Sequence, residues 1–91
     1  MKKYLCPVCF CRTLNGRGDL DVCPVCYWED DGEYDESVVN DWNSGLTIVQ
    51  ARRNYIKYGA YDKQYVKKVR KPLRTEVTDD NIKLLYKNGG K

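Results

Sequence analysis

The tetrapeptide Cys-Pro-Val-Cys occurs twice in this sequence, at residues 6–9 and again at residues 23–26, with thirteen residues between the copies. Two Cys-x-x-Cys pairs at this separation are typical of a site in which four thiolates hold one metal ion tetrahedrally. Two intervening residues let a tight turn direct both sulfur atoms at one ion, and the proline restricts the backbone of that turn. The spacing therefore predicts a metal site formed by Cys6, Cys9, Cys23 and Cys26.

Zinc is the metal that we expect at this site. A zinc ion held by four thiolates has no open coordination position, so its role would be structural and not catalytic. A rubredoxin-like iron site for electron transfer uses the same ligands, but it normally has glycine after each pair, where this chain has Phe10 and Tyr27. Two redox-active dithiols would need a thioredoxin-like context that the sequence does not provide. Iron therefore remains an alternative.

The residues between the two pairs favour a β-hairpin. Asn15-Gly16 is a strong hairpin signal, and Leu20 and Val22 alternate with acidic residues on the expected returning strand. Two cysteine turns joined by a hairpin form a zinc ribbon. The fifth cysteine, Cys11, lies only two residues after Cys9, which is poor spacing for binding the same ion, so we expect a free thiol.

Length and composition indicate one small domain in which the metal compensates for a thin core. The chain has 91 residues, 42% of them hydrophobic, and no histidine. We expect a single zinc-binding domain over residues 1–91: ribbon and acidic loop over 1–45, main helix over 46–60, basic segment and C-terminal helix over 61–91. The odd number of cysteines and the absence of an apolar leader or a membrane-length apolar run predict a cytoplasmic location.

The second half of the chain is predicted to be helical, which makes the fold class small α+β. Residues 46–59 form one helix with Thr47 or Ser44 as its N-cap and Gly59 as its stop. Its apolar stripe is Ile48, Ala51, Tyr55 and Ile56, with Arg52, Arg53 and Lys57 off the stripe. A short helix over residues 78–90 should bury Ile82 and Leu85. We expect both tryptophans, Trp28 and Trp42, to pack over the ribbon.

Charge is distributed unequally along the chain. Residues 1–46 hold four basic and nine acidic residues, a net charge of −5, whereas residues 47–91 hold twelve basic and four acidic residues, a net charge of +8. Six of the carboxylates form an acidic loop that could contact a protein partner with a basic surface or simply be solvated. These residues are Glu29, Asp30, Asp31, Glu33, Asp35 and Glu36.

Cations interleaved with tyrosines follow in the second half of the chain. This pattern suits a nucleic acid, through phosphate contacts and base stacking, although an ordinary exposed segment with its tyrosines packed inward has the same pattern. The candidate contact residues are Arg52, Arg53, Lys63, Lys67, Lys68, Arg70 and Lys71.

Several of these motifs together resemble the bacterial cysteine-rich CPCC family. The resemblance rests on the two cysteine pairs, the stretch 23–32 (CPVCYWEDDG), Asn43-x-Gly45-Leu46 and residues 51–55, and it spans about residues 4–76. Val8 stands where the family has a further cysteine, so the resemblance places the metal on the Cys-x-x-Cys frame. It implies a small zinc-binding protein. Immunity proteins that neutralise secreted toxins are of similar size, which is an analogy only.

We therefore expect a non-enzymatic protein-binding module, immunity- or adaptor-like, with one zinc ion and no membrane contact. A nucleic-acid-binding zinc module is the main alternative. An enzyme is not expected, because no histidine and no arrangement of nucleophile and base is present.

Overall fold

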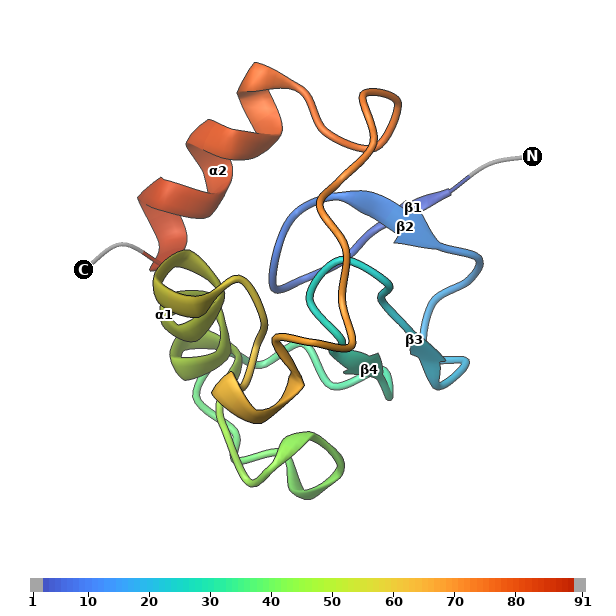
Figure 1. Cartoon of the computed structure of the whole chain (residues 1–91). Coiled ribbons are helices and arrows are strands. Elements are labelled where there is room, and N and C mark those ends of the chain that lie inside the picture. Colours follow the sequence, from blue (N-terminus) through green and yellow to red (C-terminus); the bar gives the residue numbers. More distant parts are fainter. Residues whose placement is uncertain (1–2, 90–91) are drawn as a thin grey trace.

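Four very short strands, two helices and two single-turn 3₁₀ helices make up the fold (Figure 1). The computed structural model describes residues 3–89. The elements are β1 (Tyr4–Leu5), β2 (Arg12–Leu14), β3 (Asp21–Val22), β4 (Glu29–Asp30), η1 (Asp41–Asn43), α1 (Ile48–Tyr58), η2 (Lys63–Tyr65) and α2 (Asp79–Gly89). This small α+β architecture, with a cysteine cluster and antiparallel hairpins, confirms the predicted fold class.

The strands pair differently from the prediction. β1 pairs with β2 and β3 pairs with β4, both antiparallel, so each hairpin encloses one Cys-x-x-Cys turn. The prediction of a hairpin across Asn15-Gly16 is wrong: this segment connects two separate sheets, and Leu20 and Val22 are exposed. The physical reason is that each cysteine turn itself reverses the chain, so the residues that flank it become hydrogen-bonding neighbours.

Helix α1 forms where the sequence predicts it. Thr47 and Gln50 make a reciprocal capping box, and Gly59 ends the helix with a φ of 92°. Ile48 and Ala51 are buried as expected. Arg52 does not lie off the buried stripe: it is only 5% exposed, because α1 faces the first cysteine turn as well as the core.

Helix α2 packs against α1. Thr78 and Asn81 bond to each other at its start, and Leu85 is buried as predicted. Ile82, however, is 43% exposed, so its predicted burial is wrong. The short helix turns only one narrow face inward, and Asn81 and Leu85, four residues apart, occupy it.

The core surrounds the cysteines. Trp28, Leu14, Val8 and Val25 are fully buried with them, and Tyr61 meets Trp28 edge-on at 5.4 Å between ring centres. Trp42 is 67% exposed, which contradicts the expectation that both tryptophans pack over the ribbon. The turn that contains Trp42 is held by its two buried asparagines, so the indole is not needed to anchor it.

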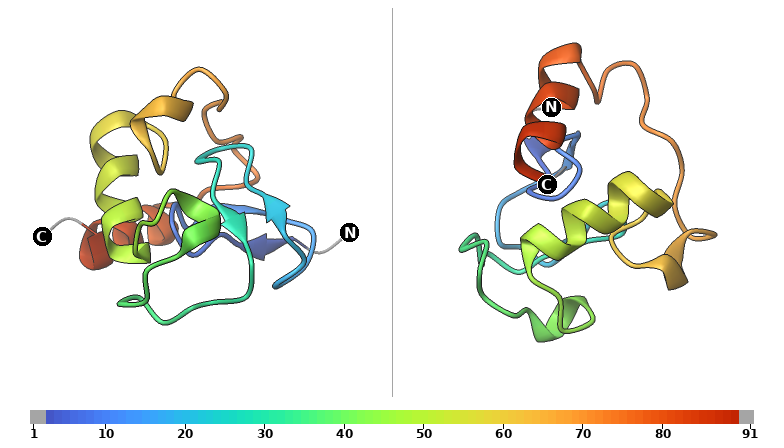
Figure 2. Two further views of the ribbon diagram at one scale, coloured as in Figure 1. Left: turned by 90° about the horizontal axis from the view of Figure 1, so that it is seen from below. Right: turned by 90° about the vertical axis from the view of Figure 1, so that its left-hand side faces the viewer.

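The connection from α1 to α2 passes along the cysteine hairpins before α2 begins (Figures 1 and 2). Its backbone bonds to both: Arg70 N–H donates to the carbonyl of Pro24 at 3.1 Å, and Arg12 N–H donates to the carbonyl of Glu76 at 2.7 Å. None of the helices described within residues 3–89 has the length and apolar character needed to cross a membrane.

Candidate metal centre

Four cysteine sulfur atoms from two separate turns meet in the interior. The Sγ atoms of Cys6, Cys9, Cys23 and Cys26 all lie within 4.8 Å of one another, and all four residues are buried. Two of the pairs, Cys6–Cys26 and Cys9–Cys23, are 3.5 Å and 3.7 Å apart. A tetrahedron with metal–sulfur bonds of about 2.3 Å has edges of about 3.8 Å, so the cluster has the size of a four-thiolate site.

The two cysteine turns have the same hydrogen-bond pattern. In the first (residues 6–9), the Phe10 N–H donates to the Cys6 carbonyl at 2.9 Å; in the second (residues 23–26), Tyr27 N–H donates to the Cys23 carbonyl at 2.8 Å. The N–H of the first cysteine in each turn donates to the carbonyl of the residue five positions later. Two similar turns thus face each other across the cluster and supply two ligands each.

The residue after each cysteine pair adopts a left-handed backbone. Phe10 has a φ of 60° and Tyr27 a φ of 75°, a region that glycine enters most readily. Both residues therefore take the conformation of the glycine that is usual in rubredoxin-like turns. The absence of glycine here does not by itself separate zinc from iron, contrary to the argument made from the sequence.

The electrostatics of the cluster favour a bound cation. Burial raises the pKa of the Cys9 and Cys26 thiols, whereas hydrogen bonds from the neighbouring thiols, Cys26 first, lower the pKa of Cys23. The Thr13 hydroxyl lies 3.0 Å from the Cys23 sulfur and can donate to that thiolate. Protein donors thus stabilise the Cys23 thiolate, and a bound cation would be needed to stabilise four thiolates in so buried a position.

Each cysteine turn is also held from outside through its proline carbonyl. Arg52 Nε donates to the Pro7 carbonyl at 2.9 Å, and its guanidinium lies 4.9 Å from the centre of the Phe10 ring. On the second turn, Pro24 accepts from the Arg70 backbone N–H. Arg52 was predicted as a nucleic-acid contact, but the structure places it here, buried and 2.9 Å from a Glu36 carboxylate oxygen.

Cys11 lies outside the four-sulfur cluster. Its thiol is completely buried, 3.8 Å from the Cys9 carbonyl oxygen. It lines a cavity of about 230 Å³ whose other walls include Tyr55 and Leu85. The second half of the chain therefore covers the fifth thiol.

The acidic loop folds largely upon itself. Asp30 is buried and accepts hydrogen bonds from the backbone of Gly18 at 3.1 Å and from the Tyr34 hydroxyl at 2.9 Å. Three more of its carboxylates accept bonds from backbone N–H groups two residues ahead, and Glu36 pairs with Arg52. Those three are Asp31, Glu33 and Asp35.

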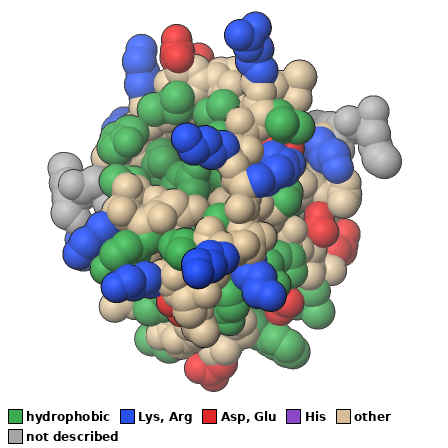
Figure 3. All heavy atoms as spheres, in the orientation of Figure 1, with side chains coloured by type: hydrophobic (Ala, Val, Ile, Leu, Met, Phe, Trp, Pro, Cys, Tyr) green, Lys and Arg blue, Asp and Glu red, His purple; other side chains and the backbone are tan. Residues whose placement is uncertain are grey.

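The predicted basic contact residues divide into two groups. Arg52 is buried, and Arg70 makes two bonds of 2.8 Å to the Glu76 carboxylate. Arg70 is exposed but engaged in this ion pair, and the rest are exposed without a salt bridge among the described residues: Arg53, Lys63, Lys67, Lys68 and Lys71. On the face shown in Figure 3, cationic side chains are spread out and separated by apolar and neutral surface.

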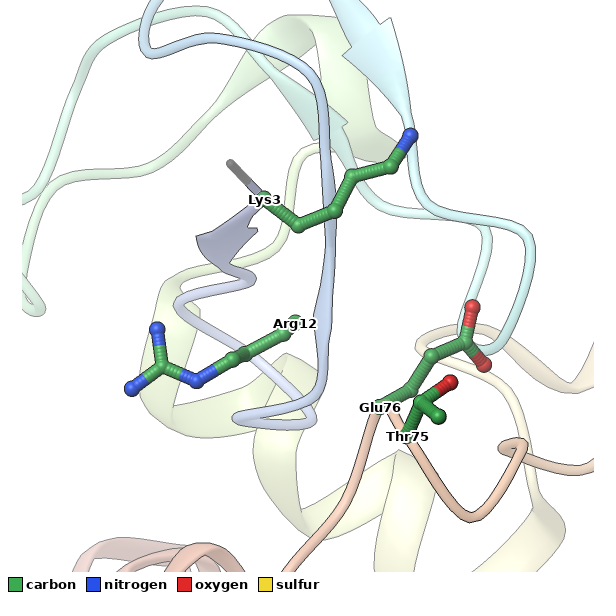
Figure 4. Close-up of a pocket in the computed structure, with 4 residues that line it drawn as sticks. All are labelled: Lys3, Arg12, Thr75 and Glu76. Atoms are coloured by element: carbon green, nitrogen blue, oxygen red, sulfur yellow. The ribbon is translucent and has the colours of Figure 1, made fainter. Parts of the chain in front are cut away.

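A further cavity lies elsewhere in the structure. It has a volume of about 330 Å³ and is lined by Lys3, Arg12, Thr75 and Glu76. Figure 4 shows that the Lys3 and Arg12 side chains extend in different directions, so their charges do not converge on one point.

Two residues to which the sequence analysis assigned no role organise the loop before α1; one of them, Asn43, entered it only through the family resemblance. Asn43 is fully buried, and its side chain accepts from the Glu29 N–H at 2.8 Å and donates to the Glu29 carbonyl at 2.9 Å. Asn40 is also buried, and its side chain donates to Asp31 at 3.0 Å. The signal that could have revealed them is two asparagines three residues apart just before Gly45, in a loop whose other side chains are acidic, apolar or serine.

One family model, described as cysteine-rich CPCC, matches residues 4–76. This range includes all four clustered cysteines and α1 but excludes α2. Neither a curated protein nor a solved structure shows a significant match to the chain.

Proposed function

Because the chain belongs to the cysteine-rich CPCC family and gathers four buried thiols, we propose that it is a small zinc-binding module whose metal is structural. The observation that carries this proposal is the compact set of four sulfur atoms, with no fifth protein ligand among the described residues. Four thiolates complete the tetrahedral shell of zinc, so neither water nor substrate would reach the ion. Bound zinc would supply the cross-link that joins the two cysteine turns.

Zinc content and metal-coupled folding test this part of the proposal. We expect one zinc per chain by elemental analysis, and we expect a strong chelator to unfold the N-terminal half, as followed by circular dichroism. Cobalt(II) substitution should give the thiolate charge-transfer bands of a tetrahedral four-sulfur site. Iron in the protein as isolated, with the red colour of a ferric thiolate centre, would instead identify an electron carrier.

The biological role that we propose is non-enzymatic binding of a protein with a basic surface, in the cytoplasm. In support, residues 18–51 contain nine carboxylates and no Lys or Arg, and four thiolates with one Zn²⁺ would add two further negative charges. Such a one-sided field attracts a cationic partner and accelerates its association. A reducing compartment would keep the free thiol and the metal thiolates intact.

Charge neutralisation tests this role. Asp35 and Asp41 are exposed, whereas Asp30 is buried and structural, so the double variant Asp35→Asn, Asp41→Asn should weaken capture of a basic partner and preserve the fold. The matched control is Asp79→Asn, Asp80→Asn at the start of α2, also exposed, which should leave capture unchanged. Equal effects of both pairs would contradict a role for the acidic region.

Nucleic-acid binding remains a second candidate, supported by the exposure of six of the seven predicted contact residues, of which Arg70 is paired with Glu76. A labelled DNA or RNA titrated at increasing salt would show a steep loss of affinity if phosphates are bound. Replacement of Lys67 and Lys68 by glutamate should abolish that binding. Binding that ignores both salt and these substitutions would exclude this candidate.

A further inference from the structure

The most exposed large apolar side chains at one end of the molecule belong to one short segment. Val38, Val39 and Trp42 are 40%, 60% and 67% exposed, and Trp42 is the most exposed large hydrophobic residue among residues 3–89. We call these three residues the Trp42 patch. Their segment projects from the body at the end opposite α2 (Figures 1 and 2). Exposed indoles surrounded by polar residues are typical of protein contact sites.

The segment that carries the Trp42 patch is rigidly held. The Asn40 N–H donates to the Leu46 carbonyl at 3.0 Å, and the Asn40 carbonyl accepts from Asn43 and Gly45 at 3.1 and 2.9 Å. The buried Asn43 side chain ties the segment to β4, and the Ser44 hydroxyl lies 3.1 Å from that of Tyr61. A surface ordered before binding loses little conformational entropy on association.

The charges near the Trp42 patch select the kind of partner. Asp35 and Asp41 are exposed within the same eight residues, and the nearest cation along the chain towards the C-terminus, Arg52, is buried and paired with Glu36. Lipid headgroups at an anionic membrane and nucleic-acid phosphates would both be repelled. A second copy of this chain that met the patch with its own patch would bring like charges together, which disfavours a patch-to-patch dimer.

We propose that the Trp42 patch is the docking centre for a different protein, one that offers an apolar pocket rimmed by Lys and Arg. The inference rests on the proposed protein-binding role and moves the centre of the binding surface from the acidic loop to the Trp42 patch. The indole supplies the buried contact, and the exposed carboxylates around it steer the partner and define its orientation. Asp30, Asp31 and Glu33, by contrast, accept hydrogen bonds that fold the acidic loop itself.

A random-peptide display library screened against the zinc-loaded full chain tests the proposal. Enriched peptides should combine Lys or Arg with an aromatic or aliphatic residue. Their affinity, measured by fluorescence polarisation, should fall at least about tenfold in Trp42→Ala and less in Val39→Ser. The matched control is Tyr86→Ala, an aromatic on α2 that is 56% exposed, which should bind as the unaltered chain does. The melting temperatures of Trp42→Ala and Tyr86→Ala should equal that of the unaltered chain, because neither of these side chains is buried.

The remaining outcomes overturn the proposal in distinguishable ways. Peptides that bind equally well to Trp42→Ala would leave the protein-binding role standing but move its site elsewhere. Enrichment of acidic peptides would refute the Trp42 patch as a docking centre for a basic partner. A failure to enrich any peptide would refute both the patch and the protein-binding role. Concentration-dependent self-association that Trp42→Ala abolishes would replace the foreign partner with a second copy.

Discussion

Arg52 on α1 donates a hydrogen bond from Nε to the carbonyl oxygen of Pro7, 45 residues earlier in the chain, at 2.9 Å. The same guanidinium stacks on Phe10 and lies 2.9 Å from a Glu36 carboxylate oxygen. One buried side chain therefore connects the main helix, the first cysteine turn and the acidic loop. The metal centre and the acidic surface are thereby parts of one cooperative structure.

Replacement of Arg52 by alanine should destabilise the zinc-loaded protein by about 2–3 kcal/mol, since the Pro7 carbonyl and the stacked Phe10 ring lose their partner. Arg52→Lys should recover little of the lost stability, because lysine lacks the planar guanidinium group of arginine. Urea unfolding measures the stability of both variants. Arg53→Ala, at the exposed neighbouring position, is the control and should change stability by less than about 0.5 kcal/mol. Similar losses at the two positions would contradict the bridging role.

Cysteine substitutions should separate the four ligands from the fifth thiol. Cys6→Ser or Cys23→Ser should lose zinc to a chelator far more readily than the unaltered chain, as followed by a colorimetric zinc indicator. Cys11→Ala should retain one zinc with unchanged affinity and lose only about 1 kcal/mol of stability through the small buried void. Zinc loss in Cys11→Ala that equals the loss in the ligand variants would mean that Cys11 binds the ion.

Asn43→Ala should lower the free energy of unfolding by about 2 kcal/mol, because the half-buried N–H and carbonyl of Glu29 both lose their partner, the buried Asn43 side chain. Hydrogen exchange at residues 40–46 should accelerate at the same time. Asn88→Ala, which removes an exposed side-chain bond to the Leu84 carbonyl on α2, is the control and should have little effect. Unchanged exchange in Asn43→Ala would show that the segment is ordered by other contacts.

Stability should fall in alkali as tyrosine ionises. Burial raises the pKa of Tyr61 to about 12, so the folded state retains the phenol proton that the unfolded chain loses near pH 10. The stabilising contribution is complete below pH 10 and disappears as the pH rises from about 10 to about 12.

Urea unfolding at a series of alkaline pH values, with tyrosinate absorbance recorded in parallel, measures this effect. Tyr61→Phe should show a shallower alkaline decline, although at neutral pH it loses about 1 kcal/mol with the contact to Ser44. Tyr86→Phe, an exposed phenol, should leave the slope unchanged. An identical slope in all three proteins would refute the assignment.

Much of the local structure could be predicted because its causes are local. The capping box of Thr47 and Gln50 and the stop at Gly59 depend on residues within one or two turns of each other. The cysteine spacing similarly specifies which four sulfur atoms can meet. The pairing of strands could not be derived in this way: the Asn15-Gly16 signal was overruled because each cysteine turn reverses the chain by itself.

The sequence by itself determined the four thiols, the two helices and the division into acidic and basic halves, since spacing, capping and charge are properties of neighbouring residues. Only the tertiary structure decided that Arg52 is buried against Pro7, that Asp30 supports its own loop and that Trp42 faces solvent. These outcomes depend on which distant segments meet. The sequence around a charged or aromatic residue is the same whether the residue ends up exposed or is covered by a segment 45 positions away, as Arg52 is by Pro7.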